Sequence, residues 1–319
     1  MRHENEPAIL FAGRTSKAFA EKICSFPGVV LGKSETIQFS EGTLFVRVNE
    51  SIRGQDVYVV QTIGTAPNDE FMELLFFIDA LKRASANSVT AVMPYFAYAK
   101  GDKKDEPRVS IRARVCADSL EAAGVDRVIT MDLHSPQIQG FFKKPVDHLY
   151  AMEALCNEIK KLNIENLVVV SPDTGFTKNA RKYSKELNAG LAIGDKVRKD
   201  HSERAEVMDI IGEVAGRNAL IVDDFTISCG TLASMARLLE KEGAKDIYAC
   251  VSHCVMSAKA LDELSASPIK QLFITDTVEN PNAFSHPKIR LVSMASVFSN
   301  AIRIIHNKQS ISDLFNGQP

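Results

Sequence analysis

The chain has 319 residues, of which 45% are hydrophobic and 24% charged, and its formal net charge is −2. This composition is typical of a globular protein and excludes a largely disordered one, and the length suits two domains of ordinary size. The near-neutral charge gives no long-range attraction for nucleic acid, so we expect a small molecule as the main partner. No apolar run approaches the ~20 residues of a membrane span, and the first residues lack a signal-peptide core, so we expect a cytoplasmic protein without a membrane partner.

The six cysteines are scattered, mostly in apolar stretches where a thiol behaves as a small hydrophobic side chain. Cys250, His253 and Cys254 could supply half of the ligands of a metal site. No second ligand pair at zinc-finger spacing accompanies them, so we expect the end of a strand here. The cysteines are Cys24, Cys116, Cys156, Cys229, Cys250 and Cys254.

The stretch Gly28 to Ser34 resembles a phosphate-binding P-loop but is one residue short between its glycines. The missing residue matters because the backbone of such a loop must wrap around a phosphate. No strand-to-helix pattern surrounds the stretch either. We therefore expect a turn and no phosphate site.

The rest of the first half alternates β-branched runs with a helical pattern, which is typical of a parallel sheet with crossover helices. Strands are predicted over 56–60, 88–92 and 127–131, and a helix is predicted over 70–83 with Asn68 as its N-terminal cap. The apolar face of that helix comprises Phe71, Leu74, Leu75, Ile78 and Leu81.

A dense charge run follows the second of these strands, from Pro94 to Arg108. The plain interpretation is a solvated loop, because most segments dense in charge are exposed to solvent. The sharper interpretation is a loop that surrounds a triphosphate with several cations. A second polar stretch, from Asp195 to Arg204, could close its cations over a phosphoryl group in transfer.

The second half repeats the α/β plan. Strands are predicted over 167–170, 219–222, 246–249 and 271–274, and a helix over 232–241 that Gly243 terminates. We therefore predict an α/β fold of two similar domains, each with a mainly parallel sheet flanked by helices, over residues 1–149 and 150–319.

Several predicted strands finish on polar residues. Asp132 and His134 follow one strand, Asp173 follows another, and Asp223 and Asp224 follow a third. Each acid taken alone is most simply a cap for the next helix. Because ligands bind outside the carboxyl ends of strands in open α/β sheets, three such ends favour a shared site.

The most specific motif runs from Asp223 to Thr231: a buried strand, an acid pair, a short turn with hydroxyls and a glycine, and a helix. Two adjacent carboxylates can bind the vicinal hydroxyls of a ribose, directly or through Mg²⁺. The turn and the helix N-terminus can bind a phosphate with backbone N–H groups and hydroxyls. This motif therefore predicts a phosphoribose site, whereas the plain alternative is an acidic helix cap.

From about Ile9 to the C-terminus, the chain resembles the ribose-phosphate pyrophosphokinase family, also called phosphoribosyl diphosphate synthetases. The matching segments are Phe39-Ser40, Arg53-Gly54, Asn68-Asp69, Met72 to Leu75, Thr130 to His134, Gln137 to Phe142, Ser171-Pro172-Asp173, Lys196-x-Arg198, Asp223 to Thr231 and Thr275-Asp276-Thr277. The resemblance implies a type I phosphoribosyltransferase-like fold and transfer of the β,γ-diphosphoryl group of ATP to O1 of ribose 5-phosphate, with Mg²⁺ as cofactor.

The resemblance also implies roles for individual residues. Catalytic residues are Lys196 and Arg198, and metal ligands are His134 and Asp173. ATP-binding residues are Phe39, Glu41, Lys100, Asp102, Lys103, Lys104, Asp105 and His134. Ribose 5-phosphate-binding residues are Asp223, Asp224, Ser228, Cys229, Gly230 and Thr231. An anion-binding inhibitory site would include Ser51, Arg53, Ser85, Arg108, Ser310 and Ser312, and the chain would form a homo-oligomer built from dimers, with a hexamer as one candidate.

The chain departs from the family pattern at several of these sites. Lys100 keeps the charge of the usual Arg but loses its planar bidentate fork. Distant members of the family also lack the Asp that Ile227 replaces. The departures are Thr43 for a Glu, Lys100 and Gly101 for Arg-Gln, Phe176 for a Gly, Asn179 for an Arg, Ile227 for an Asp, and Cys229 for a Gly or Ala.

These departures leave three hypotheses. The first is an active ATP:ribose-5-phosphate pyrophosphokinase, and the second is a catalytically weak paralogue that binds nucleotides and regulates an active synthetase by co-assembly. Retention of the acid pair and of Lys196 with Arg198 favours the enzyme. A phosphoribosyltransferase that consumes the diphosphate would suit the acid-pair loop but not the ATP-side motifs.

Overall fold

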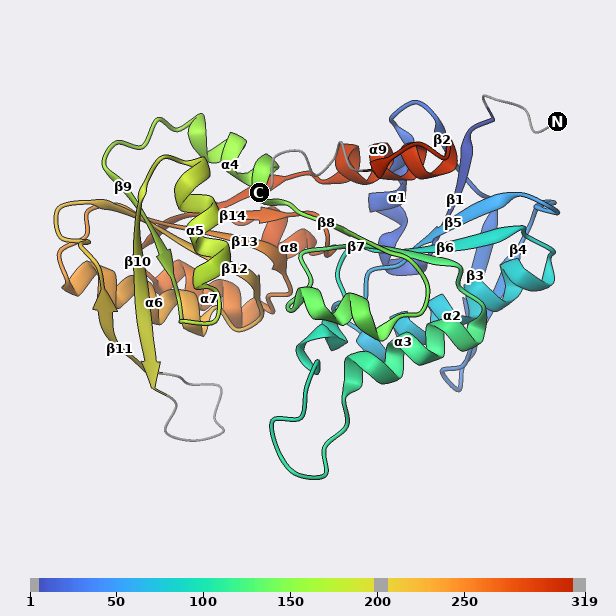
Figure 1. Ribbon diagram of the computed structural model, residues 1–319, viewed down its shortest axis with the longest axis horizontal. Helices are drawn as coiled ribbons and strands as arrows, with labels where there is room; N and C mark the ends of the chain where they lie inside the picture. Colours follow the sequence, from blue (N-terminus) through green and yellow to red (C-terminus); the bar gives the residue numbers. More distant parts are fainter. Residues whose placement is uncertain (1–5, 198–205, 312–319) are drawn as a thin grey trace. The chain divides into compact units, whose positions relative to one another are not determined.

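A computed structural model describes residues 6–197 and 206–311 (Figure 1). The chain divides into two compact units, each with its own sheet and core. The first break falls between Tyr150 and Ala151, close to the expected one. The chain then returns twice to the first unit, at 277–279 and from Met294 onward, which the expected boundaries of 1–149 and 150–319 do not include.

Unit 1 is built on a six-stranded sheet in which every neighbouring pair is parallel, in the order β2-β1-β5-β6-β7-β8. A separate antiparallel hairpin, β3 with β4, lies between β2 and β5 in the sequence. The strands are β1 (Ala8–Ala12), β2 (Val29–Leu31), β3 (Ser34–Gln38), β4 (Leu44–Val48), β5 (Asp56–Val60), β6 (Ser88–Met93), β7 (Arg127–Met131) and β8 (Val146–Leu149).

Helices cover both faces of this sheet (Figure 1). α1 (Lys17–Cys24) and α9 (Ala295–His306) pack together on one face, and α2 (Pro67–Arg83) and α3 (Arg112–Ala123) cover the other. α9 belongs to unit 1 because its apolar side is buried there, with Phe298 in edge-to-face contact with Phe19 of α1 at 5.6 Å. The short 3-10 helices are η1 (Arg14–Ser16), η2 (Ala97–Lys100) and η3 (Pro136–Phe141).

The predicted start of α2 is wrong by three residues. The helix begins at Pro67, whose missing N–H is no loss in a first turn, and the residue before it makes no side-chain cap. Asn68 is therefore not the cap; its side chain accepts a hydrogen bond from the Tyr98 hydroxyl. Glu70 binds the preceding loop instead, since its carboxylate accepts the Gly64 amide at 2.6 Å. The apolar face is as predicted, with Leu74, Ile78 and Leu81 fully buried and Phe71 and Leu75 packed on the core.

The stretch Gly28 to Ser34 is only partly a turn. Val29–Leu31 forms the edge strand β2, so the prediction of a turn is wrong for these three residues. The chain then continues into strand β3 and not into a helix. A P-loop needs a strand-to-helix transition, so this context excludes one.

Unit 2 is built on a seven-stranded sheet, in the order β11-β10-β9-β12-β13-β14-β15, in which only the β10–β11 pair is antiparallel. α4 (Met152–Lys160) and α5 (Thr177–Glu186) lie on one face, and α6 (Gly230–Lys241) and α7 (Ala258–Ala266) on the other (Figure 1). The strands are β9 (Leu167–Ser171), β10 (Gly190–Val197), β11 (Glu206–Ile211), β12 (Asn218–Thr226), β13 (Ile247–Cys254), β14 (Ile269–Thr275) and β15 (Ile289–Val292), and α8 spans Pro281–Phe284.

The predicted fold class is confirmed: both units are α/β, with mainly parallel sheets flanked by helices. All the predicted strands are present. α6 ends as expected, because Gly243 adopts the left-handed conformation (φ +82°) just beyond its last turn. Within the described residues, no helix is long and apolar enough to cross a membrane.

A lysine closes the C-terminal end of α7. The ammonium group of Lys288 donates to the carbonyl oxygens of Leu264 at 3.1 Å, Ser265 at 2.9 Å and Ser267 at 2.8 Å. A cation at this position also complements the negative end of the helix dipole. Lys288 is therefore a structural cap.

We expect Lys288→Met to lower the melting temperature in scanning calorimetry. Hydrogen bonds from a charged donor are worth about 1.5–3 kcal/mol, and each kcal/mol shifts Tm by about 2–4 °C in a domain of this size. Lys270→Met is the matched control, because Lys270 makes an exposed ion pair with Asp246, and such pairs contribute little to stability. Equal Tm losses for the two variants would contradict the capping role.

Candidate functional site

An acid pair lies in the carboxyl half of β12, near the centre of the unit 2 sheet. β12 runs through Thr226, so Asp223 and Asp224 lie within the strand rather than after it. Asp223 is half-buried and Asp224 is 8% exposed. Each carboxylate accepts the backbone amide of the following residue at 3.0 Å.

Burial raises the pKa of the Asp223 carboxyl well above its usual range, and the negative charges of Asp224 and Asp173 raise this pKa further. Asp173 belongs to the same unit because it follows β9, which pairs with β12. Three carboxylates thus act on one another at neighbouring strand ends. Such a group is stabilised by a cation or by hydroxyl donors, and its hard oxygen ligands fit Mg²⁺.

Asp173 also has the structural role that its position after a strand suggests. Its Oδ1 accepts the Phe176 amide at 3.1 Å, just before α5 begins at Thr177. The carbonyl oxygen of Asp173 accepts the Ser171 hydroxyl at 2.7 Å. Phe176 is the N-cap residue of α5, and Asn179 is exposed on its first turn.

The turn after the acid pair leads directly into α6. Ile227 is 41% exposed and Ser228 is exposed, and the Ser228 hydroxyl accepts the Gly230 amide at 3.3 Å. Cys229 is the N-cap residue with φ +62°, a left-handed conformation that glycine adopts without strain. Gly230 and Thr231 form the first turn of the helix. The backbone of this turn therefore has the form of a phosphate-binding strand–turn–helix.

The structure qualifies the expected role of Cys229. Its side chain is 1% exposed and belongs to the hydrophobic core of unit 2, beneath the turn. Only the backbone of Cys229 can therefore contact a phosphate. Burial raises the pKa of its thiol to about 12.

We expect Cys229 to resist alkylation in the folded protein. At neutral pH a thiol of pKa about 12 reacts with iodoacetamide roughly 10³-fold more slowly than an exposed thiol of pKa ~8.5, because the thiolate is the reacting form. Peptide mass spectrometry measures the modification, and the denatured chain, in which all six cysteines react, is the control. Rapid modification of Cys229 in the folded protein would show that its side chain does not lie in the core.

In unit 1, the expected nucleotide contacts Phe39 and Glu41 lie at the tip of the β3–β4 hairpin. Phe39 is 47% exposed, and its ring lies 6.4 Å from that of Phe45. The Thr43 hydroxyl donates to Glu41 at 2.6 Å, and this hydrogen bond lowers the pKa of the Glu41 carboxyl. The departure at Thr43 thus supplies a hydrogen-bond donor to Glu41, whereas a second carboxylate would repel it.

The charge run after β6 is a loop between η2 and α3. Lys100 and Asp102 are half-buried at its start, whereas Lys103, Lys104 and Asp105 are exposed. Lys103 and Asp105 form an ion pair at 3.8 Å.

Gly101 is explained by its neighbour. A Cβ atom at position 101 would lie 2.5 Å from Nε of Arg112, so no larger residue fits without moving that side chain. The Gly101 carbonyl also accepts the Ala113 amide at 3.1 Å, which joins the start of the loop to α3.

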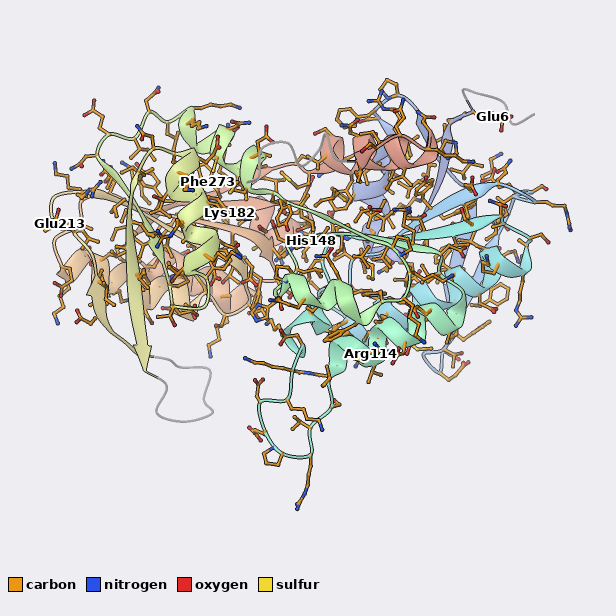
Figure 2. The ribbon with its side chains drawn as sticks, viewed as in Figure 1. Glu6, Arg114, His148, Lys182, Glu213 and Phe273 are labelled. Atoms are coloured by element: carbon orange, nitrogen blue, oxygen red, sulfur yellow. The ribbon has the colours of Figure 1, made fainter. Side chains whose placement is uncertain are left out.

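His134 follows β7 and is exposed, as its proposed role requires. The turn before it depends on a residue that the sequence patterns did not identify. The Leu133 amide donates to Nε2 of His148 at 2.9 Å, and His148 is 4% exposed on β8 (labelled in Figure 2). The only sequence signal for His148 was its position in the segment that joins the two units.

The predicted metal ligands come from different units, His134 from unit 1 and Asp173 from unit 2. Within the ranges 6–197 and 206–311, no cluster of three His, Cys, Asp or Glu side chains is arranged to hold a metal. The Cys250–His253–Cys254 segment accordingly belongs to β13, where all three side chains are buried.

Lys196 lies on β10, at a register shift between Asp195 and Lys196 in the pairing with β11. Irregular pairing of this kind is over-represented beside active sites. Arg198 lies outside the described residues.

The residues expected for an inhibitory anion site are partly brought together. The loop containing Ser51 and Arg53 meets the turn at Ser85, whose carbonyl oxygen accepts the Gly54 amide at 2.8 Å. Ser51 and Arg53 are exposed. The other positions are Arg108 in the charged loop (φ +67°) and Ser310, both exposed, and Ser312, which lies outside the described residues.

Comparison with known proteins identifies the family to which the chain belongs. Residues 8–124 match the N-terminal domain of ribose phosphate pyrophosphokinase, and residues 195–316 match the phosphoribosyl synthetase-associated domain. The chain is 42% identical to a ribose-phosphate pyrophosphokinase of Fusobacterium nucleatum, over 96% of this chain and 98% of the relative. It is 43% identical to one of Burkholderia pseudomallei, over 96% and 97% respectively.

The crystal structure of phosphoribosylpyrophosphate synthetase from Mycobacterium smegmatis superposes with a TM-score of 0.89 at 35% identity, covering 95% of this chain and all of that one. Full-length similarity at this level, together with the matched domains, shows that the chain is an enzyme of the ribose-phosphate pyrophosphokinase family.

Proposed function

We propose that this enzyme transfers the β,γ-diphosphoryl group of ATP to O1 of ribose 5-phosphate, giving 5-phosphoribosyl 1-diphosphate and AMP. The observation that carries the proposal is the acid pair of β12, which leads through a tight turn into the N-terminus of α6. This arrangement offers carboxylates for sugar hydroxyls and backbone N–H groups for a phosphate, a few residues apart.

The ribose 5-phosphate half of the site lies in unit 2. Asp223 and Asp224 would accept hydrogen bonds from the ribose hydroxyls, which are donors that a crowded pair of carboxylates binds well. The phosphate would lie against the segment from Ser228 to Thr231, with Cys229 contributing its backbone alone. Ile227, which is exposed beside this segment, adds no charge to it.

The ATP half draws on unit 1. The Phe39 ring offers an exposed aromatic face for the adenine, and Glu41 beside it is held ionised as an acceptor. The charged loop would meet the phosphates; the residues proposed for this role are Lys100, Asp102, Lys103, Lys104 and Asp105. His134 and Asp173 would hold Mg²⁺ on the nucleotide, and when bound this ion supplies positive charge to the phosphate oxygens.

In the reaction, O1 of the sugar attacks the β-phosphorus of ATP and loses its proton. The bond from that phosphorus to the oxygen it shares with the α-phosphate breaks, and AMP leaves. Phosphoryl transfer depends mainly on positioning and on cations that stabilise the spreading negative charge. Lys196 and Arg198 are proposed to supply the positive charge that stabilises the transferring group.

Sugar-dependent release of AMP tests the proposal. Purified protein is incubated with ATP and Mg²⁺, with and without ribose 5-phosphate, and AMP is measured by chromatography. The proposal predicts AMP in equimolar amount with 5-phosphoribosyl 1-diphosphate, and none without the sugar. A folded protein that binds ATP but releases no sugar-dependent AMP would instead support the regulatory paralogue, for which the apolar Ile227 in the sugar-phosphate turn is the specific observation.

Three further properties are proposed on the family relationship. The enzyme acts in the cytoplasm, and it assembles as a homo-oligomer built from dimers. The loop of Ser51 and Arg53, together with Ser85, forms part of an anion-binding inhibitory site. Sedimentation tests the oligomeric state. The effect of phosphate on activity, compared between the wild type and Arg53→Ala, tests the anion site.

A further inference from the structure

The turn that follows β7 carries His134, and its backbone is unusual. Asp132 has φ +40°, in the left-handed region that few residues other than glycine adopt, Asp and Asn being the most frequent exceptions. The next residue, Leu133, is 7% exposed and belongs to the core of unit 1, whereas His134 is exposed. The direction of His134 therefore depends on how firmly these two preceding residues are held.

Strand β8 holds both of them. β7 and β8 are parallel, with Thr130 opposite His148 and Met131 opposite Leu149. The Asp132 amide continues this ladder by donating to the Leu149 carbonyl oxygen at 3.0 Å. The next amide, that of Leu133, donates to Nε2 of the His148 ring at 2.9 Å.

His148 is itself buried and packed against neighbouring side chains. Its ring is 4% exposed and lies 4.4 Å from the ring of Tyr150. Its Nδ1 lies 3.4 Å from the side-chain nitrogen of Gln139, which comes from η3. A buried ring in this setting cannot reach a substrate, but it can act through the turn that it supports.

We infer that His148 is a positioning residue for the nucleotide half of the site: by accepting the Leu133 amide, it fixes the turn that directs His134 toward the metal-bound phosphates of ATP. The inference rests on the proposed function, in which His134 contacts that metal. The ribose 5-phosphate contacts come from unit 2 alone, so the sugar serves as an internal control. A residue that supports only the turn should affect one substrate and spare the other.

The first experiment compares two replacements of His148. His148→Leu keeps much of the volume but removes the acceptor, whereas His148→Gln keeps an acceptor oxygen. With Leu, the KM for ATP should rise about 5- to 20-fold, while the KM for ribose 5-phosphate should stay within about twofold, because only the nucleotide half is disturbed. With Gln, most of the loss should be recovered.

A matched control separates positioning from lost stability. Val128→Ala truncates a fully buried side chain on the same strand, β7, at the end away from the turn. It should lower Tm while leaving both KM values unchanged. Hydrogen exchange at the Leu133 amide supplies a readout independent of activity: exchange should speed up at least about tenfold in His148→Leu and remain slow in Val128→Ala.

The outcomes are distinguishable. Three results would each overturn the positioning role. The first is an equal rise in both KM values in His148→Leu, and the second is a similar rise in the KM for ATP in Val128→Ala. The third is an unchanged exchange rate of the Leu133 amide in His148→Leu. If the wild-type protein binds a non-hydrolysable ATP analogue but releases no AMP, the proposed reaction fails; the analogue's Kd in the two His148 variants then tests the positioning role by itself. A wild-type protein that binds no nucleotide would overturn both.

Discussion

Replacing Asp223 with Asn is expected to make the protein more stable and a poorer enzyme. Burial and two neighbouring carboxylates raise the pKa of Asp223, so its ionised form destabilises the folded state at neutral pH. An amide of the same shape removes that cost while weakening the hydrogen bonds to the ribose. Each kcal/mol relieved raises Tm by about 2–4 °C, and loss of a charge-assisted hydrogen bond should raise the KM for ribose 5-phosphate about 10- to 100-fold.

The pH dependence of the stability of Asp223→Asn, relative to the wild type, provides a check on this prediction. The pKa of the Asp223 carboxyl is higher in the folded state than in the unfolded state. The protonated carboxyl therefore favours the folded state in acid, and this contribution to stability is lost as pH rises through the folded pKa. The excess stability of Asp223→Asn should therefore be absent below about pH 4 and grow toward neutral pH. Asp246→Asn is the control, because Asp246 is an exposed ion-pair partner of Lys270. A neutral-pH Tm gain in the control, or none in Asp223→Asn, would contradict the crowded-carboxylate account.

The fold was largely predictable because its signals are local. β-branched runs predicted the central strands β5, β6, β7, β9, β12, β13 and β14 but not the strands on either side of them, and the spacing of Leu74, Ile78 and Leu81 identified the buried face of α2. The start of α2 was misplaced because Asn68, a good capping residue by type, bonds to Tyr98 instead. Local sequence does not reveal such a competing partner.

The return of the C-terminal segment to unit 1 was also beyond the sequence pattern. α9 is amphipathic, and its period predicts a helix but not which sheet will cover its apolar side. That choice is made by long-range packing, shown by the contact between Phe298 and Phe19. For the same reason, alternation of strands and helices predicts two units but not a chain that crosses between them.

The candidate site was predictable where it follows strand ends and unpredictable where it depends on burial. The mutual influence of the acid pair and Asp173 follows from the rule that polar residues at carboxyl ends of strands gather. His134 lies at a strand end of the other unit, and its part in the site stays a prediction. Cys229 was expected among the sugar-phosphate contacts, yet its side chain lies in the core, and only its backbone faces the turn. His148 carries no motif, and only the geometry of the Leu133 amide reveals it.

Replacing Lys196 with Ala should lower turnover at least about 100-fold while changing ATP affinity less than about threefold. The reason is that a cation acting on the transferring group is needed mainly in the transition state, where charge spreads over the phosphoryl oxygens. Removal of one such electrostatic contact typically costs ~10²–10³ in kcat. Steady-state kinetics gives kcat, and calorimetry with a non-hydrolysable ATP analogue gives the binding constant.

Two further variants define what this result means. Lys196→Arg keeps the charge on a differently shaped group, so it should retain more activity than Ala if the charge itself matters. Lys185→Ala removes an exposed lysine from α5 of the same unit and should change neither kcat nor affinity. Equal losses of ATP binding and turnover in Lys196→Ala would mean that Lys196 binds the ground state. In that case the charge for the transition state must come from elsewhere, with Arg198 as the next residue to replace.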